Sequence, residues 1–363
     1  MAFHIAWAER IQNLRTRLED NVQINDPLNY TKLTGTLDFL FNPTINTRTI
    51  DVIQRSLADG GRYASVDIRY TPHWGTEDLV INDAAASCTK NNQRRDSINS
   101  FDVDLYAEMK FTLEKNYVRQ NTEGNDSYQQ RFDRSMMSAM RVARESMSAQ
   151  CLGKMAGLIG ANPAQSVASG AYHSVELIDT NAGASVDNFD IFKNDQQDNF
   201  MSGPIAIIGQ AGNARKYFNR LAVGNLNTNA GVNIADVAAQ FGALYFQDQS
   251  GLAQLGAANR VLAVYPGLTQ IYGYNLYANE DMGLDSPDNR IETTMPDPIY
   301  PFDWDVIIEY DNNCDTGNGH QGAWVVRVFK YFDVFTTPAA AFGDTYGDLE
   351  DFNGILGYTI TAA

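Results

Sequence analysis

Hydrophobic and polar residues alternate without interruption between residues 101 and 114. A repeat of two places successive side chains on opposite faces of a β-strand. The pattern therefore predicts one strand roughly 43 Å long, at about 3.3 Å per residue, which is more than twice the usual length. The apolar face consists of Phe101, Val103, Leu105, Ala107, Met109, Phe111 and Leu113.

A helical repeat follows from Tyr128 to Ile159, after a polar turn at residues 121–126. Its apolar residues recur at steps of three and four, which predicts a helix about 48 Å long. Four methionines in one stripe can line a binding groove. The regular spacing favours core packing, and we adopt that interpretation. The stripe contains Tyr128, Phe132, Met136, Met140, Ala143, Met147, Cys151, Met155 and Leu158.

The chain before the long strand predicts helices and then an extended arm. Apolar residues at helical spacing between Phe3 and Leu18 indicate an amphipathic N-terminal helix, and residues 49–57 predict a short second helix. Alternation around residues 66–70 predicts a strand. We expect residues 62–117 to form a long two-stranded arm, with Arg94 and Arg95 near its tip. A hairpin of this length needs support from its own body or from another subunit.

Strands and helices alternate after Pro204, which predicts a compact α/β lobe ending near Asp281. The expected strands and helices of this lobe are residues 205–208, 212–223, 234–241, 243–246 and 261–265. Beyond the lobe, residues 304–310 and 323–335 predict a hairpin, and residues 355–360 predict a last strand.

Composition and charge limit the classes of function. The chain has 363 residues, 44% of them hydrophobic and 20% charged, as is typical of a folded protein. It contains no apolar run of signal-peptide or membrane-spanning length, and its three cysteines lack a disulfide or zinc spacing. We therefore expect folding in cytoplasm. The net charge of −17 disfavours a nucleic-acid groove and docking on an anionic membrane.

Motifs of catalysis and ligand binding give no convincing match. Gly317, Gly319 and Gly322 have the spacing of a dinucleotide-binding loop, but an apolar strand follows where that loop needs a helix. Asp311, Asn313 and Asp315 have the alternation of a calcium loop, but Gly322 stands where the bidentate glutamate belongs, which favours a surface turn. The sequence has no HExxH, GxSxG or Walker A motif. We expect no enzyme activity, metal or cofactor.

The order of these parts resembles the Hong Kong 97-type fold of tailed-bacteriophage major capsid proteins, which encapsulins share. The resemblance rests on the succession of N-arm, long hairpin, long helix, α/β lobe and returning strands, and it covers most of the chain. It implies an α+β fold with an N-terminal arm at 1–61, an extended hairpin (E-loop) at 62–117 and an axial α/β domain at 200–290. A peripheral domain with the long spine helix is implied at 118–199 and 291–363.

The resemblance implies a structural protein that assembles as hexamers and pentamers into an icosahedral shell around packaged double-stranded DNA. The implied location is the virion, after assembly in host cytoplasm. The implied partners are other copies of the chain, with portal, scaffolding or decoration proteins in addition. Two alternatives stay open at this point: an encapsulin-like compartment with a protein cargo, and an α/β hydrolase-type enzyme using carboxylates of residues 204–281.

If the chain forms a shell, its arm and its long helix are the expected contact surfaces between subunits. Uneven charge supports complementary surfaces, since residues 291–363 hold twelve acidic and two basic side chains. The expected interface residues are Arg94, Arg95, Asp102, Asp104, Glu108, Arg131, Arg134, Arg141 and Arg144.

Overall fold

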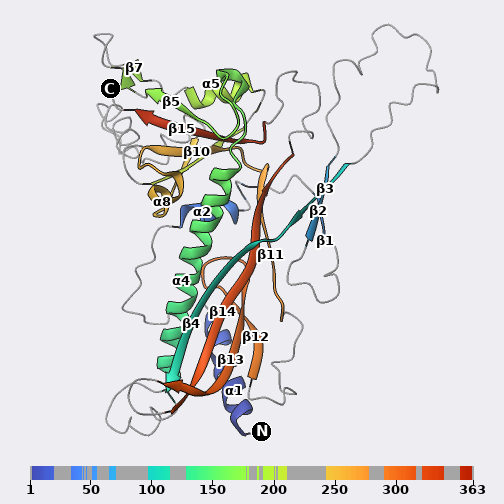
Figure 1. The fold of residues 1–363 in the computed structure, drawn as a ribbon, viewed down its shortest axis with the longest axis vertical. Coiled ribbons are helices and arrows are strands. Elements are labelled where there is room, and N and C mark those ends of the chain that lie inside the picture. The colour runs from blue at the N-terminus through green and yellow to red at the C-terminus, as the bar shows by residue number, and fades with distance from the viewer. Residues whose placement is uncertain are drawn as a thin grey trace, which may run out of the picture. The chain divides into compact units, whose positions relative to one another are not determined.

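The computed structural model describes the chain in separate stretches of residues. They are 2–19, 34–42, 44, 46, 51–54, 65–70, 97–114, 128–176, 178–179, 186–187, 191–199, 201, 203–210, 243–277, 290–315, 321–338 and 352–361. Helices and mainly antiparallel sheets coexist, so the fold is α+β as expected (Figure 1). The helices predicted at 212–223 and 234–241 lie outside the described residues, as do Arg94 and Arg95.

The chain divides into two compact units. Unit 1 comprises Met1–Lys32, Asp104–Met147 and Gly273–Phe332, and unit 2 comprises Leu33–Val103, Ser148–Tyr272 and Asp333–Ala363. Helix α4 (Tyr128–Gly157) and strand β14 (Gln321–Thr336) contribute residues to both units. The domain ranges implied by the family resemblance remain predictions.

Unit 1 contains an antiparallel sheet of long strands. Strand β14 pairs on one side with β13 and on the other with β4, and β13 also pairs with β12. The strands β13 and β14 confirm the hairpin predicted near the C-terminus. The strand bounds are β4 (Leu105–Glu114), β12 (Arg290–Pro296) and β13 (Asp303–Asp315).

Helix α1 (Ala2–Glu19) packs against both α4 and this sheet through Trp7. The Trp7 ring lies 5.3 Å from Phe132 of α4 and 5.2 Å from Trp324 of β14, measured between ring centroids. Edge-to-face contacts of this kind add to the gain from burying aromatic surface. The amphipathic N-terminal helix predicted from sequence is therefore confirmed, with Ile11 and Leu14 fully buried.

The long helix is confirmed as α4, which has 30 residues. Its apolar stripe is buried from Phe132 to Met155, with at most 1% exposure, and Leu158 just beyond the helix is half-buried. The methionines therefore pack into the core and leave no open groove along that face. The buried members of the stripe are Phe132, Met136, Met140, Ala143, Met147, Cys151 and Met155.

The single long strand predicted at 101–114 was wrong, because the chain forms two strands there. Strand β3 (Ser97–Asp102) pairs with β2 (Ser65–Tyr70), whereas β4 pairs with β14. The break falls at residues 103–104. Alternation in sequence indicates which face of a strand is buried, but it does not indicate where a strand ends. Val103 is buried, so the alternating pattern continues across the break although the strand does not. Two strands within the predicted arm do pair with each other, namely β2 and β3.

Unit 2 contains a mixed five-stranded sheet in the order β5-β15-β10-β8-β9. The parallel pairs are β5 with β15 and β8 with β9, and the other neighbours are antiparallel. The last strand, β15, thus joins the sheet of the predicted α/β lobe, whereas the family resemblance implies a place for residues 291–363 in the peripheral domain. The bounds are β5 (Tyr172–Glu176), β8 (Ile205–Gly209), β9 (Ala243–Gln247), β10 (Arg260–Val264) and β15 (Ile355–Thr361).

Shorter elements complete the described residues. The predicted helix at 49–57 was wrong, because the structure has strand β1 (Asp51–Gln54), which pairs with β2. A helix at Gly35–Leu40 (α2) was missed. The remaining elements are η2 (Pro163–Gln165), β6 (Ile178–Asp179), β7 (Val186–Asp187), α5 (Ile191–Asp198), α8 (Gly251–Leu255) and β11 (Thr269–Tyr274), which lies beside β14.

Candidate functional site

The predicted interface residues of the long strand lie at and beyond the junction of β3 and β4. Asp102 ends β3 and Asp104 precedes β4, and both side chains are exposed. Glu108 is half-buried within β4, where its carboxylate accepts a hydrogen bond from Nε of Arg327 at 2.8 Å. Asp102 in unit 2 and Asp104 in unit 1 are therefore exposed carboxylates. The Glu108 carboxylate binds Arg327 within its own sheet.

Tyr106 shares the environment of this Glu108–Arg327 pair. Burial, followed by the negative charge of Glu108, raises the pKa of Tyr106 to about 12. The phenol stays neutral at physiological pH and remains a hydrogen-bonding group beside Arg327. The Tyr106 ring also packs against Tyr331 of β14, with 4.8 Å between centroids. This part of β4 is fixed to β14 by side chains as well as by backbone pairing.

The four predicted arginines of α4 differ in exposure. Arg134 is exposed, and Arg131 and Arg141 are half-buried. Arg144 is only 3% exposed, and its Nε lies 3.2 Å from Oδ2 of Asp297 in the same chain. Its guanidinium also lies over the ring of Tyr300, 5.9 Å from the centroid.

Arg144 is therefore corrected from an expected subunit contact to an internal residue of unit 1. Its partner Asp297 also accepts hydrogen bonds from Trp304 Nε1 at 2.8 Å and from the backbone N–H groups of Ile299 and Tyr300. A buried carboxylate is stable when such donors replace its lost water. The spacing of arginines on α4 could not reveal this, because Asp297 lies far away in sequence.

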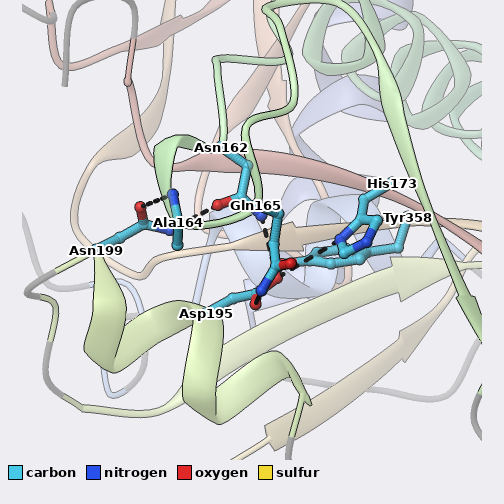
Figure 2. Close-up of polar contacts among 7 residues, drawn as sticks. All are labelled: Asn162, Ala164, Gln165, His173, Asp195, Asn199 and Tyr358. Atoms are coloured by element: carbon cyan, nitrogen blue, oxygen red, sulfur yellow. Dashed lines mark hydrogen bonds and ion pairs between the residues drawn. The ribbon is translucent and has the colours of Figure 1, made fainter. Parts of the chain in front are cut away.

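A second buried carboxylate, Asp195 of α5, organises a polar network in unit 2 (Figure 2). Its Oδ2 accepts hydrogen bonds from Tyr358 at 2.7 Å and from Asn162 at 3.0 Å, and its Oδ1 accepts one from Gln165 at 2.7 Å. Asn199 donates to Asn162 at 3.0 Å and extends the network. Figure 2 shows these side chains converging from α5, the segment after α4, and β15.

The electrostatics of this network keep its phenol protonated. Burial, and then the Asp195 charge, raise the pKa of Tyr358 well above its usual range. His173 lies at the rim of the network, with Nδ1 3.9 Å from Oδ2 of Asp195. Side chains from separate parts of the chain thus donate hydrogen bonds to one carboxylate. Through Tyr358, this network holds the last strand, β15, against the rest of unit 2.

A third buried carboxylate, Asp248, joins α2, α4 and the turn before α8. Its Oδ2 accepts hydrogen bonds from the Thr36 hydroxyl at 2.7 Å and from the Ser148 hydroxyl at 2.6 Å. Its Oδ1 accepts hydrogen bonds from the backbone and side chain of Ser250. The three aspartates were not predicted as special, since isolated carboxylates in polar segments carry no periodic or motif signal.

Gly317 and Gly319 of the glycine-rich segment lie outside the described residues. Gly322 lies at the start of β14, so a strand follows the glycine-rich segment. The surface turn expected at Asp311, Asn313 and Asp315 was wrong, because these residues belong to strand β13, which pairs with β14. The backbone N–H of Asn313 donates to Asp311 at 2.8 Å within that strand. Within the described stretches, no group of three His, Cys, Asp or Glu side chains is arranged to hold a metal ion.

No helix among the described residues combines the length and the apolar character needed to cross a membrane. The described polar clusters are internal, and their carboxylates receive donors from the chain itself. The features of the described residues that fit contact with another molecule are surface features: the carboxylates at the β3–β4 junction, Arg134, and exposed apolar side chains. The large apolar side chains in question are Ile98, Val142, Leu252, Leu276 and Ile299.

Comparison with known proteins finds likeness in structure and none in sequence. No protein-family model matches the chain, and no curated protein matches it. The capsid of cyanophage A-1(L) is similar over 93% of this chain and 95% of its own, with a TM-score of 0.49 and 11% identity. The virus-like particle from Pyrococcus furiosus is similar over 96% of this chain and 98% of its own, with a TM-score of 0.39 and 11% identity.

A further similar structure is the capsid of cyanophage P-SCSP1u, with a TM-score of 0.43 and 11% identity over 85% of each chain. The three structures are two phage capsids and one virus-like particle. At such identities the likeness concerns the fold and carries no information on individual residues.

Proposed function

We propose that this chain is the structural subunit of a closed protein shell, a major capsid protein. The observation that carries the proposal is the order of elements along the chain. An N-terminal helix, a strand pair β2–β3, the 30-residue helix α4, a mixed sheet around β8 and β10, and the long hairpin β13–β14 follow one another. This is the succession that the resemblance to Hong Kong 97-type capsid proteins implies.

The proposed contacts between subunits lie on the arm and on the exposed side of α4. Ile98 of β3 is 58% exposed and lies near the carboxylates Asp102 and Asp104 in sequence. An exposed apolar side chain with charged neighbours suits the edge of a protein interface. We propose that this edge meets a neighbouring copy, with Arg94 and Arg95 contributing from the tip of the arm.

The helix contributes Arg131, Arg134 and Arg141 to the same proposal, and Arg144 is left out because it is buried. Single exposed ion pairs contribute only about 0–1 kcal/mol, so a shell held by them alone would be weak. A closed shell repeats each contact by symmetry and adds buried apolar surface at every copy. Repetition, more than the strength of one contact, would stabilise the particle.

We further propose that the subunits form hexamers and pentamers of an icosahedral head that encloses double-stranded DNA, assembled in host cytoplasm. The supporting observation is the net charge of −17. A negatively charged wall does not bind the phosphate backbone, so it leaves packaged DNA free to move in and out. Portal, scaffolding or decoration proteins belong to the same proposal as further partners.

Electron microscopy of the purified chain tests the proposal directly, together with size-exclusion chromatography. We expect capsomers or closed particles with a mass far above the 40.2 kDa of one chain. The nucleic-acid content of the particles then separates a genome shell from a protein-cargo compartment. A protein that stays monomeric over a wide range of concentration and salt would contradict the shell.

The double substitution Arg94→Glu and Arg95→Glu tests the arm. We expect a strong loss of assembled particles with little change in the thermal unfolding of the unassembled chain. Lys193→Glu is the matched control, because Lys193 is exposed on α5 and lies outside the proposed contacts. Normal assembly of the double variant would contradict the proposal that Arg94 and Arg95 contribute to the contacts between subunits.

A further inference from the structure

Lys330 of β14 is an unusual lysine, because only 3% of it is exposed. Lysines are almost never so buried unless their ammonium group has a dedicated partner. The Lys330 amine donates a hydrogen bond to Oδ1 of Asn275, which follows β11. It also lies 5.8 Å from the ring centroid of Phe302. The Lys330 amine therefore contacts the Asn275 carboxamide next to the aromatic ring of Phe302.

The same carboxamide is held from its nitrogen side by a carboxylate. Nδ2 of Asn275 donates to Oδ1 of Asp305 at 3.3 Å and to the backbone oxygen of Asp303 at 2.9 Å. Asp305 is completely buried, and it also accepts hydrogen bonds from the backbone N–H groups of Leu276 and Tyr277. An amine, a carboxamide and a carboxyl group are thus lined up within unit 1.

We propose that Lys330 and Asn275 join in an isopeptide bond within one chain, with Asp305 as the proton carrier. Nζ of Lys330 attacks Cγ of Asn275, the new C–N bond forms, and the Cγ–Nδ2 bond breaks. The amine loses one proton, and the departing Nδ2 group gains one and leaves as ammonia. Asp305 gives a proton to Nδ2 and recovers one from Nζ, so it ends unchanged. No oxidant or cofactor is consumed.

The protonation states in this cluster favour the reaction. Burial lowers the pKa of Lys330 to about 8, although the charges of Asp305 and Asp303 act in the opposite direction. Burial raises the pKa of Asp305, partly offset by the N–H groups that it binds. A neutral amine is a nucleophile, and a neutral acid can protonate a leaving group. Both groups are shifted toward the forms that the step needs.

The contact between the Lys330 amine and the Asn275 carboxamide should also raise the rate of bond formation. Amide formation from an amine and a carboxamide is slow in water, and fixed proximity raises the effective concentration of the two groups greatly. The bond would tie the segment after β11 to β14 and close a loop from Asn275 to Lys330. It lies within one subunit, so it strengthens the subunit and does not link neighbours. The inference therefore stands independently of the proposed shell.

The intact mass of the purified wild-type chain tests the proposal without any variant. We expect a mass lower than that of the sequence by one ammonia. We also expect a protease digest to contain a branched peptide joining the segments around Asn275 and Lys330. A folded chain with the full mass of its sequence would overturn the proposal.

Three variants separate the bond from other losses of ammonia. Lys330→Arg keeps the positive charge and should restore the full mass, as should Asn275→Ala. Asp305→Asn keeps the amine and the carboxamide and should greatly slow the mass loss. The control Lys154→Arg alters another lysine, one that pairs with Asp333, and should leave the mass loss unchanged. Persistence of the loss in Lys330→Arg would indicate cyclisation of an asparagine and overturn the proposal.

Discussion

Several buried carboxylates of this protein each serve more than one donor. Asp297 receives the guanidinium of Arg144, the indole of Trp304 and two backbone N–H groups. Removing a single donor leaves a charge that water cannot reach, and that costs more than the intact pair contributes. At the scale of residues, these aspartates are therefore positions at which the loss of one donor lowers stability.

Arg144→Ala should destabilise the chain by about 3–5 kcal/mol, because Asp297 keeps its negative charge without its cation. Urea unfolding followed by tryptophan fluorescence measures the change, and Trp304 reports on the same site. The control is Arg134→Ala on the exposed side of α4, which should change stability by about 0.5 kcal/mol or less. Equal effects of the two substitutions would refute the internal role of Arg144.

Tyr358→Phe should alter the dependence of stability on alkaline pH. The pKa of Tyr358 is raised above its unfolded value of about 10, so the folded chain holds the phenol proton more tightly. The resulting stability is present below about pH 10 and is lost as pH rises through the folded pKa. The variant should be less stable by about 1–2 kcal/mol at neutral pH, since Asp195 loses a donor.

This difference between wild type and Tyr358→Phe should narrow as the solution becomes more alkaline. Thermal unfolding midpoints, measured in parallel for both proteins at several pH values, give the comparison. A difference that stays constant at all pH values would show that the Tyr358 phenol does not contribute through its ionisation.

At the scale of elements, the packing of α2 on β9 depends on a glycine. A Cβ added at Gly35 would lie 2.5 Å from the backbone oxygen of Gln247, so the two elements would have to move apart. Gly35→Ala should therefore destabilise the chain by about 1–3 kcal/mol. Chemical unfolding measures the loss.

Gly157 at the end of α4 is the matched control for Gly35. A Cβ added there meets nothing within 4 Å. Gly157→Ala should be neutral or stabilise by up to about 1 kcal/mol, because alanine favours a helix more than glycine does. A similar loss in both variants would mean that close approach to β9 is not what requires Gly35.

The elements with a strong periodic pattern were predictable from the sequence. The stripes of α1 and α4 and the apolar runs of β8, β10, β13 and β14 report burial directly, and burial determines these elements. The failures have a common physical origin. Residues 51–54 became a strand because β2 offers backbone partners there, and the sequence around them does not record that neighbour.

Strand partners and buried carboxylates were the least predictable features. Alternation at 101–114 was correct for the face that is buried, but it did not reveal that β3 pairs with β2 while β4 pairs with β14. Arg144 was expected to be a surface residue because its partner is far away in sequence. The proximity of Lys330, Asn275 and Asp305 likewise follows from tertiary packing alone.

At the scale of the whole molecule, the net charge bears on the assembly of the proposed shell. Each chain carries a net charge of −17, so identical copies repel one another at low ionic strength. Salt screens this repulsion, with a Debye length of about 10 Å at 0.1 M. Assembly of the proposed shell should therefore become more complete as salt increases. Light scattering across a salt series measures the effect.

The control for this prediction is a variant with less negative charge, such as Asp198→Lys on the exposed end of α5. It should assemble at lower salt than the wild type. Assembly that weakens steadily with added salt would show instead that attraction between opposite charges dominates the contacts.

The pairing of β4 with β14 has a consequence for biosynthesis. Leu105 faces Phe332 in this ladder, so more than half of the chain separates the two strands. While the ribosome is still making the middle of the protein, β4 has no partner on the β14 side. Domains complete their folding only when such distant segments have emerged. A half-made chain therefore lacks a finished sheet in unit 1, and this sheet can close only after β14 has left the ribosome.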